Sequence, residues 1–203
     1  VLSYIGSGFS VGRSRSQVSS ANLKADGSIL QLPAGTLKVA LGGQIRHESF
    51  IRKGSSFTST VAPVPQESAD VSRTVSAAFA EIYAPIFGPE NRRPGLERLE
   101  VTIAGRVEHY SDVGATANPK IGVDWEPAEG VLLRSSYGRS FRAPALREAH
   151  DPALYSPSRL PFGAGTVLSL LLYGGNPDLD PETATSWTAG IDLTPARFPG
   201  LRL

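Results

Sequence analysis

Hydrophobic and polar residues alternate with a period of two through much of this sequence. In residues 99–109 the apolar side chains occupy odd positions, whereas the even positions are mostly charged or polar. Residues 37–50 and 120–126 repeat the pattern. Because successive side chains of a strand point to opposite faces, each segment is predicted to be a strand with one apolar and one polar face.

This pattern predicts an all-β chain of about eight strands, with a ninth beginning near Leu201. Helical spacing is weak, and only residues 143–150 are expected to form a turn or two of helix. The predicted strands cover residues 3–13, 27–33, 36–50, 72–87, 98–111, 117–126, 130–141 and 184–194.

The connections between these strands differ in length at their two ends. If the strands run up and down in sequence order, short turns such as 33–35 and 127–130 fall at one end. The two longest connections, about 52–71 and 142–183, both fall at the other end. Short turns at one rim and long loops at the opposite rim are typical of antiparallel, up-and-down outer-membrane barrels.

Aromatic residues near the strand ends agree with this arrangement. Tyr83, Phe87 and Trp125 lie near the short-turn end of their strands, and Trp187 lies near the long-loop end. Aromatic rings gather where a barrel wall crosses the two lipid interfaces. We therefore expect these four residues to be interface aromatics with a structural role.

A soluble β-sandwich also alternates polar and apolar residues, and it is the alternative fold. In a sandwich, Val101, Ile103, Ile121 and Val123 would pack against a second sheet. The clearest strands carry no charge on their apolar side, which favours a wall that faces lipid. Charged residues on the other side, among them Lys38, are predicted to line a watery interior and to pair across strands.

Composition narrows the possible partners and chemistry. The 203 residues include 20 basic and 19 acidic side chains, so a nucleic-acid binder that neutralises phosphates is not expected. The chain has no cysteine, which excludes disulfides and thiolate metal sites. It has no methionine and no apolar run as long as a membrane-spanning helix, and we expect it to lie within a longer protein.

Several segments resemble, in order and spacing, the barrel of TonB-dependent outer-membrane receptors. The most specific are Ser140-Phe141-Arg142-Ala143-Pro144 and Asn176-Pro177 with Leu179, Pro181 and Glu182. The similar segments read LPAGTLKVALGGQIRHESF, AAFAEIYAPIF, LERLEVTIAGRVEHYSDVGATANPKIGVDWEPAEGVLLRSSYGRSFRAPAL and GNPDLDPETATSWTAGIDL.

The resemblance implies a larger barrel of about 22 strands that encloses a plug domain, of which this chain is a part of about eight or nine strands. It implies import of a scarce nutrient, typically a ferric siderophore or cobalamin, driven by the inner-membrane TonB complex through an N-terminal box. We find no plug, TonB box or closing terminal strand, and expect one partial barrel domain over residues 1–203 that does not transport alone. The implied setting is the outer membrane of a Gram-negative bacterium, with lipid and a small-molecule ligand such as a metal chelate as partners.

The connection at 142–183 contains the residues considered for ligand contact. Arg142 either braces the loop or meets an anion, and we favour bracing because Pro144 ends the strand there. His150 has two interpretations, a ligand contact or a solvated loop residue. The candidate ligand-binding residues are Arg142, His150, Asp151, Tyr155 and Arg159.

The sequence offers little for enzyme chemistry. It contains no Gly-x-Ser-x-Gly elbow, no HExxH motif and no phosphate loop, and we expect no catalytic residue, metal site or cofactor. His47 and His109 fall on the apolar side of their strands, where a metal role is not favoured. An outer-membrane hydrolase remains an alternative because the members of a Ser-His-acid site lie far apart in sequence, as does a soluble binding sandwich.

Overall fold

The computed structural model describes residues 8–58 and 61–194, in which nearly all regular structure is strand. No helix in these ranges is long and apolar enough to cross a membrane. Residues 3–7 of the first predicted strand, and the strand predicted near Leu201, lie outside the described residues. The elements are β1 (Phe9–Leu32), β2 (Gly35–Phe57), β3 (Val64–Pro65), β4 (Ala69–Phe87), β5 (Arg98–Tyr110), β6 (Gly114–Ala128), β7 (Val131–Arg142), α2 (Leu146–His150), β8 (Leu154–Phe162), β9 (Gly165–Tyr173) and β10 (Glu182–Leu193).

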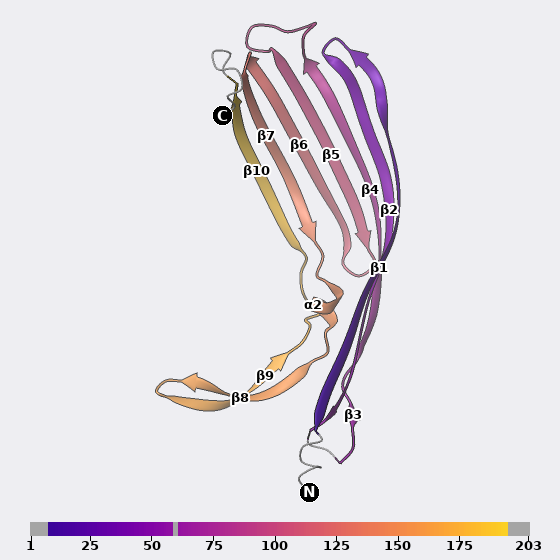
Figure 1. Ribbon diagram of the computed structural model, residues 1–203, viewed down its shortest axis with the longest axis vertical. Helices are drawn as coiled ribbons and strands as arrows, with labels where there is room; N and C mark the ends of the chain where they lie inside the picture. The colour runs from indigo at the N-terminus through magenta and orange to yellow at the C-terminus, as the bar shows by residue number, and fades with distance from the viewer. Residues whose placement is uncertain (1–7, 59–60, 195–203) are drawn as a thin grey trace. The chain divides into compact units, whose positions relative to one another are not determined.

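The main sheet follows the order of the sequence. Its path among the described residues is β1-β2-β4-β5-β6-β7-β10, with β3 paired to β2 (Figure 1). The pairs β4–β5, β5–β6, β6–β7 and β7–β10 are antiparallel. Strands that are joined by short turns lie next to each other in the sheet. The predicted up-and-down antiparallel sheet is thus confirmed, and β8 and β9 form a separate hairpin.

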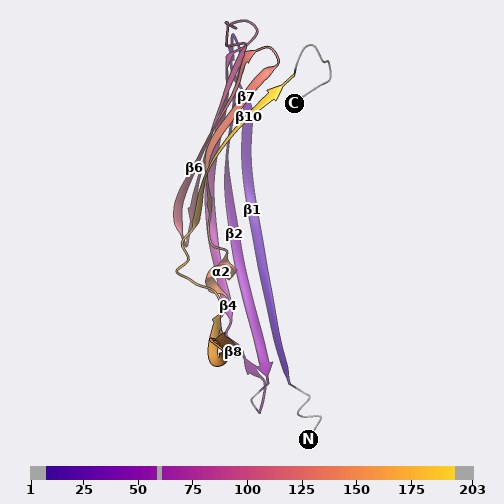
Figure 2. The same ribbon diagram turned by 90° about the vertical axis from the view of Figure 1, so that its left-hand side faces the viewer.

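The chain divides into two compact units. The sheet unit contains Ser20–Arg46, Val75–Arg142 and Glu182–Leu203, and the loop unit contains Val1–Ser19, His47–Thr74 and Ala143–Pro181. In the sheet unit the strands form a single layer, as Figure 2 shows. In the loop unit, α2 and the β8–β9 hairpin lie between β7 and β10 in sequence.

β1 is one continuous strand where two were predicted, at 3–13 and 27–33. Residues 14–26 are rich in serine and other polar side chains and have no clear apolar side. The alternation that marks the other strands is therefore absent there. The segment is still a strand because its backbone pairs with β2.

The two long connections contain more regular structure than the sequence pattern indicated. β2 continues to Phe57 and β4 begins at Ala69, so the predicted loop at 52–71 is partly strand. The connection at 142–183 contains α2, in agreement with the helical turn expected at 143–150, followed by the hairpin.

Candidate functional site

One face of the sheet unit is apolar, and its side chains align in rows across the strands. In one row Ile82 lies opposite Ile103, Ile103 opposite Ile121, Ile121 opposite Tyr137, and Tyr137 opposite Trp187. Directly opposite residues share a face of a sheet. Ile103 is 53% exposed and Ile121 is 40% exposed, so no second sheet of the described residues buries them. This is the arrangement of a wall that faces lipid and differs from the core of a sandwich.

The opposite face carries charged side chains that pair with one another. Arg106 Nη2 lies 2.8 Å from Glu108 Oε1 and donates to Gln44 Oε1 at 2.6 Å. Arg134 pairs with Asp192 across β7 and β10. Pairs that remain in contact with water contribute little stability each. They keep this face hydrophilic, as expected for the interior of a watery barrel.

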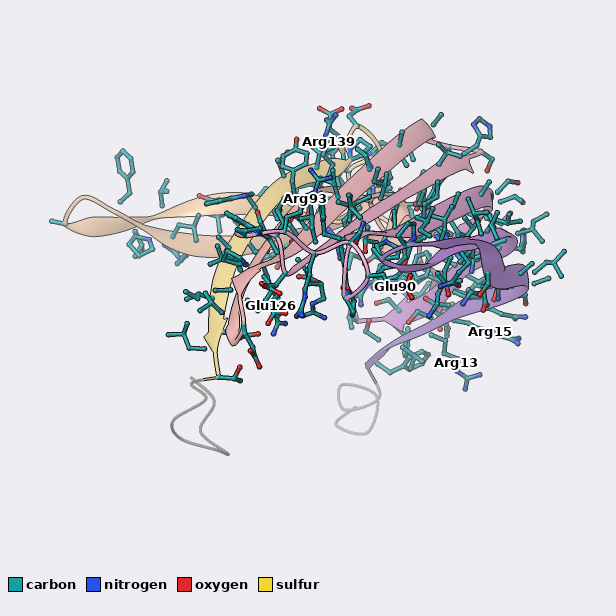
Figure 3. All side chains as sticks on the ribbon, turned by 90° about the horizontal axis from the view of Figure 1, so that it is seen from above. Arg13, Arg15, Glu90, Arg93, Glu126 and Arg139 are labelled. Carbon is teal, nitrogen blue, oxygen red and sulfur yellow. The ribbon has the colours of Figure 1, made fainter. Side chains whose placement is uncertain are left out.

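Arg139 is a charged residue on the apolar side of the sheet. It lies opposite Thr185 near the end of β7, and Figure 3 shows it on the other side of the ribbon from Glu126. The cost of a charge on a lipid-facing surface falls to about 0–1 kcal/mol near the membrane interface. Its position near a strand end is therefore compatible with a lipid-facing wall.

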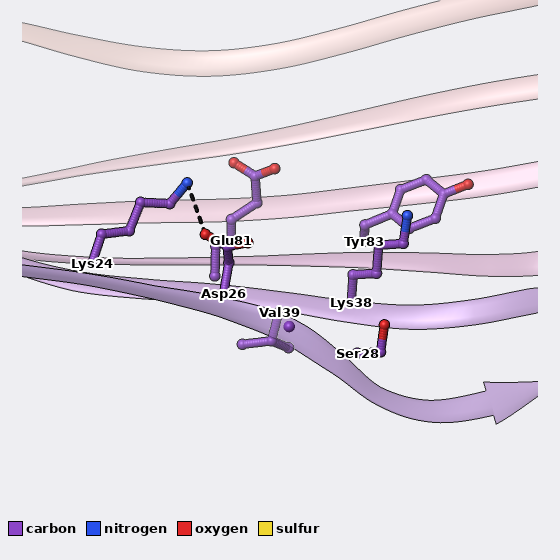
Figure 4. A pocket seen from close by; sticks show the side chains of 9 residues that line it. Lys24, Asp26, Ser28, Lys38, Val39, Glu81 and Tyr83 are labelled. Atoms are coloured by element: carbon purple, nitrogen blue, oxygen red, sulfur yellow. Dashed lines mark ion pairs between the residues drawn. The ribbon is translucent and has the colours of Figure 1, made fainter.

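Tyr83 does not lie where an interface aromatic was predicted. It is on the charged face, and Lys38 Nζ lies 5.9 Å from the centre of its ring. Tyr83, Lys38 and Glu81 line a cavity of about 550 Å³ that also contains the Lys24–Asp26 ion pair (Figure 4). Side chains two residues apart in a strand point to the same face. Tyr83 is two residues from the inward-facing Glu81 and therefore lies on the charged face.

The other three predicted interface aromatics lie on the apolar face. Trp125 is opposite Leu99, and its indole Nε1 donates to the carbonyl oxygen of Gly95 at 2.9 Å. Phe87 is also opposite Leu99, because an irregularity in β4 between residues 85 and 87 shifts the register. Trp187 lies in the middle of β10, and its Nε1 donates to Ser135 Oγ at 3.2 Å. Their contact with the lipid interface stays a prediction.

Trp125→Phe is expected to lower the free energy of unfolding by about 1 kcal/mol, because it removes the hydrogen bond to Gly95 and keeps an apolar ring. Trp125→Ala should cost more, because the ring is lost as well. Urea unfolding of the full-length protein in lipid vesicles measures both. Ligand preference should be the same in both variants, and a changed preference with unchanged stability would contradict a structural role.

The loop unit contains a largely buried ion pair at the base of the longest connection. The side chain of Arg73 on β4 is 6% exposed, and its Nη2 lies 2.7 Å from Glu48 Oε2 on β2. Arg73 Nη1 also donates to the carbonyl oxygen of Pro144 at 2.8 Å. Arg73 therefore joins two strands to the start of the connection that follows β7.

Apolar packing and a second ion pair hold α2 in the same unit. Leu146 of α2 packs with Phe50 and Ala69 in the buried cluster of the described residues. Arg52 Nη1 lies 2.6 Å from Asp151 Oδ1, just after α2. Both partners are less than one quarter exposed, so the pair is partly shielded from water. Apolar packing and an ion pair together thus hold the start of the connection between β7 and β10 in place.

The end of the connection returns to α2 through backbone contacts. Gly175 N donates to the carbonyl oxygen of Asp151 at 2.7 Å, and Asn176 N donates to the carbonyl oxygen of Glu148 at 2.9 Å. A Cβ atom at Gly175 would lie 2.5–2.6 Å from backbone atoms of residues 149–151. A glycine at position 175 is therefore required by close backbone packing.

Gly175→Ala is expected to destabilise the loop unit by about 1–3 kcal/mol, because the added methyl group overlaps backbone atoms that cannot move independently. Faster cleavage of residues 143–181 in limited proteolysis measures the effect. Gly190→Ala is the control, because a Cβ at Gly190 meets no atom within 4 Å. Equal cleavage rates in the two variants would show that the close approach has no consequence.

The five candidate ligand-binding residues have different surroundings. Arg142 Nη1 lies 2.7 Å from Glu182 Oε1, and Asp151 is paired with Arg52. His150 is half-buried at the end of α2. Tyr155 and Arg159 are exposed on β8, at odd positions that share one face. Within residues 8–58 and 61–194, neither makes a side-chain hydrogen bond or an ion pair.

Nothing in the described residues has the geometry of a metal centre. No group of three or more histidine, cysteine, aspartate or glutamate side chains is close enough to hold an ion. His109 lies opposite Ala115 and Ser76, on the apolar face as predicted. His47 Nδ1 is 3.4 Å from Thr74 Oγ1.

The sequence did not identify Arg73, Glu48 and Arg52 as residues that hold the long connection. Their contacts form only when segments distant in sequence meet.

Comparison with known proteins agrees with this geometry. Residues 3–201 match the family model described as TonB dependent receptor-like, beta-barrel. The chain is similar to the iron-regulated outer membrane virulence proteins of two Vibrio cholerae serotype O1 strains, Classical Ogawa 395 and El Tor Inaba N16961. Each is 27% identical over 157 residues, which cover 77% of this chain and 20% of the relative. The chain thus spans a fifth of the length of these curated relatives.

The match confirms the family resemblance and the barrel-type fold predicted from the sequence. It also confirms the predicted outer-membrane location, and because the family consists of receptors, the chain is not an enzyme. This chain belongs to the TonB-dependent receptor-like β-barrel family and is part of a protein of the Gram-negative outer membrane.

Proposed function

We propose that the chain is part of the wall of a receptor that imports a scarce nutrient with energy supplied through TonB. The observation that carries this proposal is the two-faced sheet, apolar on one side and lined with paired charges on the other. Such a wall separates lipid from a watery interior through which a polar solute can pass. No covalent chemistry is required, because capture and movement of the ligand are sufficient.

A ferric chelate is the nutrient class that the comparisons favour. The relatives are named as iron-regulated, and iron-regulated outer-membrane receptors suit a ligand that becomes limiting when iron is scarce. Cobalamin is the other substrate class implied by the resemblance. The ligand meets the long connection first, and the plug and the TonB contact belong to the remainder of the receptor.

Uptake by cells that depend on the full-length receptor tests this function. Growth under iron limitation should be restored by one or more ferric siderophores, and uptake of the labelled chelate should stop when TonB is removed. A cobalamin panel run in parallel distinguishes the second substrate class. Uptake that persists at the same rate without TonB would contradict energy-coupled transport.

Within the proposed function, Tyr155 and Arg159 are the best placed of the five candidate residues to contact a ligand. A guanidinium binds an anionic chelate by charge-assisted hydrogen bonds, and a tyrosine ring covers its apolar parts. Arg142 and Asp151 already have partners within the chain. We therefore assign them to supporting roles, with His150 beside the ligand-contacting strand.

Arg159→Ala is expected to raise the Kd for the transported chelate by about 10–100-fold, because one charge-assisted hydrogen bond is lost. Tyr155→Ala should also weaken binding. Arg92→Ala is the control, because it removes an exposed arginine whose pair with Glu97 has a 3.5 Å separation. Titration with the labelled chelate measures all three, and equal affinity in the Arg159 variant would exclude this contact.

A further inference from the structure

The apolar face of the sheet unit carries an arginine without a counter-ion from the surrounding strands (Figure 3). On β5, β6, β7 and β10 this face consists of odd-numbered residues, and among those described Arg139 is the only arginine, lysine, aspartate or glutamate. Both strands that flank β7 are described, and the Arg139 guanidinium makes no hydrogen bond or ion pair with any described residue. The wall around Arg139 therefore supplies no anion.

The position of Arg139 in its strand indicates which anion can reach it. Arg139 lies three residues before the end of β7, at the end from which the long connection starts (Figure 1). An arginine on a lipid-facing wall lays its apolar stem along the surface and extends its guanidinium to the headgroup region. The anions at that depth are lipid phosphates. A lipid phosphate is therefore the anion best placed to meet this guanidinium.

A hydroxyl group lies beside the guanidinium. Thr185 on β10 is directly opposite Arg139, on the same face of the sheet, and is exposed. A guanidinium can donate two parallel hydrogen bonds to a phosphate, and a hydroxyl can donate one more to another oxygen. The two residues together thus offer a phosphate more donors than an isolated arginine does.

Two aromatic rings lie next to Arg139, on the side toward the middle of the strand. Tyr137 is two residues before Arg139, and Trp187 is directly opposite Tyr137. Trp187 is 70% exposed and Tyr137 is 43% exposed. The indole Nε1 of Trp187 already donates to Ser135 Oγ at 3.2 Å, so the rest of the ring presents apolar surface. A cation above an exposed aromatic pair matches a lipid, whose phosphate lies above its acyl chains.

We propose that Arg139, Thr185, Tyr137 and Trp187 form a binding site for one anionic phospholipid-type molecule of the leaflet next to the long connection. Arg139 and Thr185 bind the phosphate, and the two rings contact the upper part of the acyl chains. A free phosphate ion would make no use of the aromatic pair. This inference goes beyond the proposed transport function and does not depend on it, because its test measures lipid contact and not uptake.

Photoactivatable lipids test the site in the full-length receptor. The receptor is placed in phosphatidylcholine vesicles that contain a trace of phosphatidylglycerol or of phosphatidylcholine, each with the same photoreactive group in its acyl chain. Labelled segments are identified by mass spectrometry. At residues 131–142 and 182–193, the anionic lipid should label about tenfold more than the zwitterionic lipid, because charge-assisted hydrogen bonds favour it.

Variants of the cation separate a specific site from the overall charge of the receptor. Arg139→Gln should abolish the preference for the anionic lipid, and Arg139→Lys should keep part of it, because the charge remains without the planar fork. Arg92→Gln removes the same charge from an exposed arginine in the connection between β4 and β5 and should keep the full preference. Unchanged urea unfolding shows that each variant is folded.

Three results would overturn the proposal. The first is an equal preference in the receptor and in Arg139→Gln, and the second is an equal loss in Arg139→Gln and Arg92→Gln. The third is loss of the preference when inorganic phosphate replaces chloride at the same ionic strength, as expected for a site that binds the free ion.

Discussion

Arg73→Ala is expected to lower the free energy of unfolding of the receptor by about 3–5 kcal/mol, which is the cost of breaking a buried ion pair by removing one partner. Arg73 is almost fully buried, and its loss leaves the Glu48 carboxylate and the carbonyl oxygen of Pro144 without its donors. The start of the longest connection should open first. Chemical unfolding in vesicles and limited proteolysis after residue 143 measure the two effects.

Two further variants separate the buried charge from side-chain size. Arg73→Met preserves much of the volume and should be nearly as destabilising, because Glu48, whose side chain is only 17% exposed, loses the Arg73 cation. Combining Arg73→Met with Glu48→Leu should recover part of the loss, since both charges are then removed. Arg92→Ala deletes an exposed arginine and should change stability by less than about 0.5 kcal/mol. Equal stability of the Arg73 and Arg92 variants would refute a structural role for this pair.

The fold was largely predictable because, among the described residues, no second layer covers the apolar face of the sheet. Residues 98–110 alternate so that their apolar side chains share the uncovered face and their charges share the other, and this alternation is visible in sequence. The middle of β1 is polar throughout, so the same signal was absent. Its strand structure depends on pairing with β2, which a single sequence does not show.

The residues that fasten the long connection were only partly predictable. Arg142 and Asp151 were identified from their position in the loop, but Asp151 meets Arg52 across 99 residues of sequence. Arg73 meets Pro144 across 71 residues. A charged residue within a strand gives no indication of its distant partner or of its burial. Tyr83 is a different case. It is two residues from Glu81 in the same strand, so its position on the charged face could have been predicted from the sequence.

Ile103→Lys is expected to destabilise the receptor in a membrane by about 2–4 kcal/mol, the cost of a lysine on a lipid-facing surface at mid-depth. Ile103 is in the central row of the apolar face, between Ile82 and Ile121, with half of its surface exposed. Ile103→Ala gives the effect of removing the side chain without adding charge. Urea unfolding in vesicles measures the difference between the two variants.

Thr102→Lys is the matched control, one residue away on the opposite face. Thr102 lines a cavity of about 410 Å³ with Glu81 and Asp124, where an added ammonium group finds both water and carboxylates. The free energy of unfolding of the Thr102→Lys receptor should therefore change by less than about 1 kcal/mol, as for most substitutions at hydrated surfaces. The difference in stability between the lysine variants at residues 102 and 103 depends only on which face of the sheet contacts hydrocarbon. A soluble sheet with water on both faces would tolerate either lysine, so equal stabilities at residues 102 and 103 would contradict a lipid-facing wall.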